Sequence, residues 1–141
     1  MDRIISDVDL TIDELREYLA DKKNLLDEIL SKYAFYDFKV INMHRGGHII
    51  SCKYDDDHLL FNLRIGEGLM IAMQRIEPRV IKSIDVSALS IDGKKALSEK
   101  KFCQTGFWVY LDIKDNSCLD DLFYLVDKRI ENLNRVNKKV N

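Results

Sequence analysis

The chain has 141 residues, of which 46% are hydrophobic and 33% charged, a mixture typical of one folded domain with a core. A single proline and six glycines favour regular elements over loops, which excludes disordered and collagen-like classes. The net charge of -2 indicates neither a strongly basic nucleic-acid binder nor an acidic tail.

Three features of the sequence bear on the compartment. No apolar stretch approaches the roughly 18 residues that a membrane span requires, so we expect no membrane association. The N-terminal residues 1–10 carry acidic side chains early and lack the apolar core of a secretion signal. Cys52, Cys103 and Cys118 are odd in number and widely spaced, which suits reduced thiols better than a disulfide framework. We therefore expect a cytoplasmic protein.

The first predicted element is an amphipathic helix that begins near Thr11. Thr11 and Glu14 fit a capping box, in which the hydroxyl accepts from the amide three residues on and the carboxylate reaches back. Apolar residues then recur at steps of three and four as far as Tyr33, and the polar segment 21–24 interrupts them. We expect a kink at this segment.

Four strands with short turns are predicted next, because polar and apolar positions alternate and β-branched and aromatic residues are frequent. The turns between them hold two glycines, three aspartates, and two glycines around a glutamate. This pattern predicts an antiparallel meander. Its strands cover residues 35–43, 48–54, 59–65 and 69–74.

The second half of the chain is predicted to add further strands and a closing helix. After Pro78, residues 79–86 fit a fifth strand, and residues 87–104 fit either a short helix or a long loop. Residues 107–113 alternate as a last strand. The closing helix is expected to begin at about Ser117, with Ser117 or Asn116 as its cap.

This order of elements predicts one α+β domain over residues 1–141. We expect an antiparallel sheet of about five to six strands, with the N- and C-terminal helices packed on one face. The other face, or a sheet edge, is then the place to look for function. An unpaired edge would also allow two copies to form a homodimer.

Candidate catalytic and metal-binding residues are few. His44, His48, Cys52 and His58 have ligand chemistry, but their spacing matches no zinc motif, which favours structural roles. The aspartates at 55–57 lack the alternation of a calcium loop and fit a solvated turn. Cys103 follows two lysines, a setting that can activate a thiol, although such lysines are usually only surface charges. We expect no catalytic residue, no metal and no cofactor, and hence no enzyme.

Residues 58–101 contain eight basic and five acidic side chains, so charge is uneven along the chain. If the sheet brings the basic ones together, they would contact phosphates or steer an acidic partner; otherwise they form an ordinary mixed-charge surface. The candidates for nucleic-acid binding on a sheet face are Arg64, Arg75, Arg79, Lys82, Lys94 and Lys95.

Trp108 and Tyr110 alternate with the apolar residues of the last strand, so they are predicted to lie on the face away from the helices. Exposed aromatic residues there are typical of protein-binding hot spots or of platforms for nucleic-acid bases. The alternative is a second small core under residues 87–104. We take Trp108, Tyr110 and Arg64 as the candidate partner-binding residues.

The order of parts over roughly residues 48–135 resembles a small domain of unknown function found in bacteria and phages. That domain is fused to some predicted transport and restriction-nuclease-like proteins. The resemblance rests on the strand pair 59–65 and 69–74, the segment 84–87, Gly106 before the last strand, and Asp120–Leu122 opening the last helix.

The resemblance implies a sheet with one wet face and no established catalytic set. The chain departs from it at residues 90–101, where members of the family usually carry a segment with glycine and tryptophan. The broader double-wing group is similar in layout, and its association with DNA comes to this chain only as an analogy of fold.

These observations predict a small non-enzymatic binding or regulatory module that acts through a protein partner. Inhibitors, immunity proteins and chaperones of phage or bacterial defence systems are examples of this type. Binding of nucleic acid through a basic sheet face is the alternative.

Overall fold

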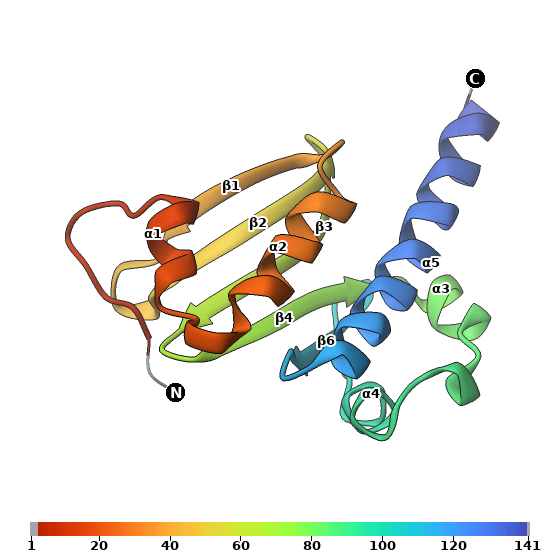
Figure 1. Cartoon of the computed structure of the whole chain (residues 1–141). Helices are drawn as coiled ribbons and strands as arrows, with labels where there is room; N and C mark the ends of the chain where they lie inside the picture. The colour runs from red at the N-terminus through yellow and green to blue at the C-terminus, as the bar shows by residue number, and fades with distance from the viewer. Residues whose placement is uncertain (1–2, 141) are drawn as a thin grey trace.

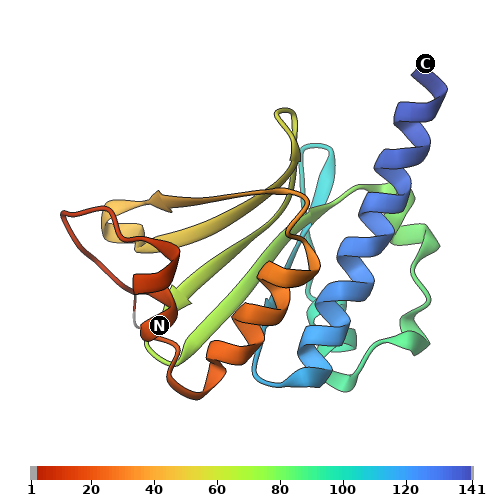
Figure 2. The ribbon, with the colours of Figure 1, turned by 45° about the horizontal axis from the view of Figure 1, so that its top comes forward.

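The computed structural model describes residues 3–140, and side chains as far as residue 137. It has an α+β fold in which one six-stranded antiparallel sheet, in the order β1-β2-β3-β4-β6-β5, carries all the helices on one side (Figures 1 and 2). The predicted meander of four strands is confirmed. The strands are β1 (Asp37–Asn42), β2 (His48–Asp55), β3 (His58–Gly66), β4 (Leu69–Ile76), β5 (Lys101–Cys103) and β6 (Gly106–Asp112).

The predicted N-terminal helix is two helices, α1 (Ile12–Glu17) and α2 (Lys23–Lys32), joined by a 3-10 turn. The capping box is confirmed: the amide of Glu14 donates to Oγ1 of Thr11, and the amide of Thr11 donates to Oε1 of Glu14, each over 3.1 Å. The helix breaks completely because Ala20 has a φ of 54°, which no α-helix accommodates.

The segment between β4 and β5 corrects one prediction. Residues 79–86 are not a strand: α3 (Pro78–Ser83) and a 3-10 turn (Val86–Ala88) replace it. Pro78 occupies the first helical position, where its missing N–H group has no partner to lose. For the ambiguous residues 87–104, the helical alternative holds in part, because α4 (Ile91–Ser98) precedes the short strand β5.

The closing helix α5 (Asn116–Val140) begins one residue before the predicted start. The amide of Cys118 donates to Oδ1 of Asp115 over 3.0 Å, so Asp115 is the cap and not Ser117 or Asn116. Among residues 3–140, no helix combines the length and the apolar character that crossing a membrane would need.

Two buried clusters lie between the helices and the sheet. The larger packs α1, α2 and α5 on the sheet and includes Leu15, Leu26 and Phe61. The smaller packs α3 and α4 on the ends of β4 and β6, around Val80 and Val109. The second small core that the sequence offered as the alternative does exist beside residues 87–104, but Trp108 and Tyr110 are not in it. They lie on the other face of the sheet, as the alternation predicted.

Candidate functional site

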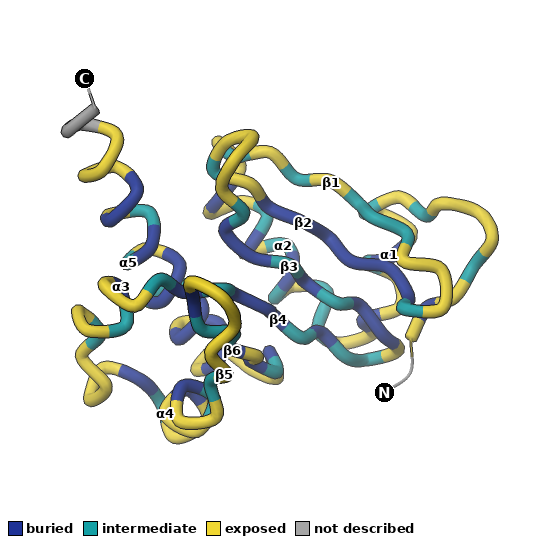
Figure 3. The backbone as a smooth tube through the Cα atoms, turned by 180° about the vertical axis from the view of Figure 1, so that it is seen from behind, coloured by how far each residue is buried: buried dark blue, intermediate teal, exposed yellow. Residues whose placement is uncertain are grey.

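One face of the sheet is left uncovered by the helices of the described chain, and we call it the open face. Residues directly opposite in an antiparallel pair share a face, so the register assigns each side chain to one side of the sheet. Figure 3, in which the molecule is turned by 180° from the view of Figure 1, looks onto this face. Its members are Asp37, Lys39, Ile41, Ile49, Ser51, Lys53, Asn62, Arg64, Ile71, Met73, Arg75, Lys101, Trp108, Tyr110 and Asp112.

The centre of the open face is buried although no helix of residues 3–140 lies over it. Ile49 and Met73 are each 7% exposed, and Ser51 is 3% exposed, yet none of the three belongs to the helix-side cores. Their cover comes from the side chains around them. The face therefore has a packed middle and a rim of exposed charges such as Lys39 and Lys53.

An aromatic pair lies at the β6 end of the open face. The rings of Trp108 and Tyr110 stack with centroids 6.4 Å apart and planes inclined by 24°, and Tyr110 is 51% exposed. Arg75 lies opposite Trp108 on one neighbouring strand, and Lys101 lies opposite it on the other. Trp108 thus lies between two cations, and its stacking partner Tyr110 lies opposite Met73.

The open face has an excess of positive charge, with five basic and two acidic side chains. Within the described residues, neither Arg64 nor Arg75 forms an ion pair with a carboxylate. Nε of Arg64 and Oδ1 of Asn62 and of Asp112 are buried without a hydrogen-bond partner among the described atoms.

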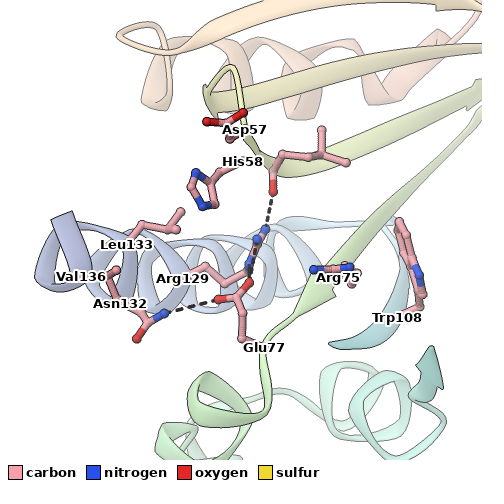
Figure 4. A pocket seen from close by; sticks show the side chains of 10 residues that line it. Asp57, His58, Arg75, Glu77, Trp108, Arg129, Asn132, Leu133 and Val136 are labelled. Carbon is pink, nitrogen blue, oxygen red and sulfur yellow. Dashed lines mark hydrogen bonds and ion pairs between the residues drawn. The ribbon is translucent and has the colours of Figure 1, made fainter. Parts of the chain in front are cut away.

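A cleft of about 530 Å³ adjoins this face where β3 begins, β4 ends and α5 passes (Figure 4). At its base, Arg129 is 4% exposed and donates through Nε and Nη2 to Oε1 of Glu77, over 3.1 and 2.9 Å. Nη1 of Arg129 donates to the carbonyl oxygens of Leu59 and Leu60. Burial lowers the pKa of Arg129, and the charge of Glu77 opposes this effect.

The walls of the cleft combine polar and apolar groups. Nδ2 of Asn132 lies 3.5 Å from Oε2 of Glu77, while Oδ1 of Asn132 is buried without a partner in the described structure. Leu133 and Val136 of α5 supply apolar surface, and Trp108 closes the far end. The cleft thus joins α5 to the aromatic end of the open face.

The structure brings some predicted site residues together and separates others. Trp108, Tyr110 and Arg64 lie on the same face, as expected, and Arg75 lies with them. The other four nucleic-acid candidates were predicted to lie on a sheet face, and this prediction is wrong, because they lie on helices. Arg79 and Lys82 are exposed on α3, and Lys94 and Lys95 on α4.

The histidines and cysteines do not converge. His48 is buried: its Nδ1 lies 2.8 Å from the carbonyl oxygen of Ile4, and the amide of Leu10 donates to its Nε2, which fastens the N-terminal segment to the sheet. His44 is exposed in a turn, and burial raises the pKa of Cys52 to about 12. Over residues 3–140 no three side chains of metal-ligand type lie close enough to hold an ion.

His58 lies at the mouth of the cleft, where its Nδ1 is 2.8 Å from Oδ1 of Asp55. Burial works against ionisation of Asp55, but hydrogen bonds from His58 and from the amide of Asp57 outweigh it and lower the pKa of Asp55. The aspartate turn is therefore organised by its own hydrogen bonds, as a solvated turn would be.

Sequence reasoning missed the cleft residues Arg129, Glu77 and Asn132. One signal was present: Arg129 lies three residues after Val126 and four before Leu133, on the apolar stripe of the closing helix. A charged residue on such a stripe indicates a buried partner. The partner itself is 52 residues away in the chain, and no local pattern identifies it.

Comparison with models of protein families, with curated proteins and with solved structures finds no match to this chain.

Proposed function

We propose that the protein is a non-enzymatic binding module that holds an acidic segment of a protein partner on its open face. The observation that carries the proposal is the stacked pair of Trp108 and Tyr110, in which Trp108 lies between Arg75 and Lys101. Tryptophan, tyrosine and arginine dominate the binding energy of protein interfaces. Regulators of the inhibitor, immunity or chaperone type bind their targets through such surfaces.

The charge and rigidity of the face support this choice. Five basic residues against two acidic ones complement a negatively charged segment and speed its approach. The two rings are already stacked on one strand, β6, so little side-chain freedom is lost when a partner arrives.

The test uses the full chain as bait, with variants that alter only the open face. Tyr110→Ser removes exposed aromatic surface, and Arg64→Gln removes one cation. Phe35→Ser is the matched control, because Phe35 is 92% exposed but lies outside the open face. A cross-linked partner is identified, and the affinity of its contacting segment, made as a peptide, is measured by calorimetry.

We expect Tyr110→Ser to lower the affinity for the peptide by at least about tenfold, as hot-spot truncations do. Arg64→Gln should lower this affinity by less. Phe35→Ser should leave the affinity unchanged. Equal affinity of the wild type and Tyr110→Ser would overturn the proposal, as would a contacting segment without acidic residues.

Single-stranded nucleic acid is the second candidate, favoured by the same combination of stacked aromatic rings and surrounding cations. Fluorescence anisotropy with a labelled oligothymidine distinguishes the two. A nucleic-acid site would show an affinity that falls steeply with salt and is lost in Tyr110→Ser. Absence of binding at low salt would remove this candidate.

A further inference from the structure

We propose that the cleft beside Arg129 is a second binding site, which takes a small organic anion with a flat ring. It is distinct from the proposed protein-binding surface, because its base and one wall come from α5 on the helix side of the sheet. Only Arg75 and Trp108 belong to both. A volume of about 530 Å³ falls in the range of roughly 300–1,000 Å³ that small-molecule sites occupy.

The charges inside the cleft favour the binding of an anion. Arg75 and Arg129 bring two guanidinium groups, whereas Glu77 is the carboxylate that faces them from the end of β4. Oε1 of Glu77 already accepts two hydrogen bonds from Arg129, which leaves Arg75 without a carboxylate among the described residues. Asp57 lies at the exposed mouth, where water screens it.

The pKa of Arg129 gives separate evidence that the two guanidinium groups are close together. Burial lowers the pKa of Arg129 first of all, and the positive charge of Arg75 lowers it further. An anionic head placed on Arg75 would offset this repulsion. The planar fork of an arginine binds a carboxylate or sulfonate through two parallel hydrogen bonds.

The remaining walls fit a ring. Trp108 offers an aromatic surface at one end, and Leu133 and Val136 offer aliphatic surface on α5. Asn132, which is 8% exposed, completes the polar part of this wall beside Glu77. Glu77 fixes the orientation of this amide by attracting its Nδ2.

The probe is 1-anilinonaphthalene-8-sulfonate, which combines flat rings, one N–H donor and one anionic group. The chain has a single tryptophan, Trp108, so quenching of its emission together with a rise in probe emission reports binding beside Trp108, and a variant at Val136, which lines only the cleft, assigns that binding to the cleft. The matched ligand is N-phenyl-1-naphthylamine, which has the same rings without the sulfonate.

Two variants alter the cleft and two serve as controls. Arg75→Gln removes the anion-binding group, and Val136→Phe fills the space from a half-exposed position on α5. Arg64→Gln makes the same chemical change as Arg75→Gln on the same face but outside the cleft, and Tyr110→Ser alters the proposed protein surface. Urea midpoints verify that each variant is folded.

We expect Arg75→Gln and Val136→Phe each to lower the affinity for the sulfonate probe by about tenfold or more. The two controls should change this affinity by less than about twofold. The wild type should bind the neutral amine more weakly than the sulfonate. Arg75→Gln should bind the two ligands with equal affinity. Equal losses for Arg64→Gln and Arg75→Gln, or unchanged binding in Val136→Phe, would overturn the proposal. Because Tyr110→Ser separates the two sites, the protein-binding proposal stands or falls independently.

Discussion

Gly93 lies directly against the carboxylate of Asp121: a Cβ atom at position 93 would stand 2.5 Å from Oδ2. Asp121 is buried and accepts from both the amide and the hydroxyl of Ser90. The same hydroxyl accepts from the amide of Gly93 over 3.2 Å and so caps α4. This contact joins the start of α4 to α5 and leaves no room for a side chain.

Gly93→Ala should therefore destabilise the protein by about 1–3 kcal/mol, as overpacking does, although alanine is normally the better helix residue. Urea unfolding followed by circular dichroism measures the change. Lys94→Ala, at an exposed position of the same helix, should stay within about 0.5 kcal/mol of the wild type. A gain in stability for Gly93→Ala would contradict the described contact.

Arg129→Met should cost about 3–5 kcal/mol, because it leaves Glu77 and the carbonyl groups of Leu59 and Leu60 without their donor. The double variant Glu77→Met with Arg129→Met should lose less than the sum of the two single variants. Denaturant unfolding of all four proteins completes the cycle. Additive losses would mean that the two side chains do not interact.

Asp115→Asn should show a dependence on pH that reports the cap of α5. The hydrogen bond from the amide of Cys118 lowers the pKa of Asp115 from its ordinary value of 3.8. A carboxyl group with a lower pKa in the folded state contributes stability above its unfolded pKa, and that contribution is lost as pH falls through the folded pKa. The gap in urea midpoint between wild type and variant should therefore be constant above about pH 5 and close below about pH 4.

Asp56→Asn is the control for this titration, since Asp56 is exposed in the turn between β2 and β3. Its midpoint should follow that of the wild type over the whole range. A gap for Asp115→Asn that persists unchanged to pH 3 would show that the charge of the cap has no role.

The three thiols should differ sharply in reactivity. Burial raises the pKa of Cys52 to about 12 and raises that of Cys118, whereas Cys103 is exposed on β5. A disulfide reagent such as dithionitrobenzoate should therefore modify one thiol in the native protein and all three in denaturant. Cys103→Ser should leave the native protein almost unreactive. Rapid modification of that variant would contradict the burial of Cys52 and Cys118.

Those parts of the fold that depend on local patterns could be predicted from the sequence. The alternation of residues 107–113 places Trp108 and Tyr110 on the open face, and the spacing of Thr11 and Glu14 places the helix start. Residues 79–86 were assigned wrongly because their few apolar side chains fit either period, and Pro78 at the first helical position decided between them.

The cleft was beyond such reasoning, since it depends on contacts between distant segments. Arg129 donates to the carbonyl of Leu59, 70 residues away, and to Glu77, which belongs to no motif. No local sequence pattern predicts which backbone carbonyls accept hydrogen bonds from Arg129 or where α5 crosses the sheet. The open face followed from periodicity, whereas its neighbouring cleft followed only from the tertiary structure.

The strand order also bears on how the chain acquires its structure. Strands β1, β2 and β3 each pair with the next strand in the chain across a short connection, so little entropy is lost in closing each one. The pairing of Ile76 with Phe107 must instead close the whole segment 77–106, which carries α3 and α4. Assembly should accordingly nucleate in the meander, and the pairing of β6 with β4 should be the late step that completes both proposed binding surfaces.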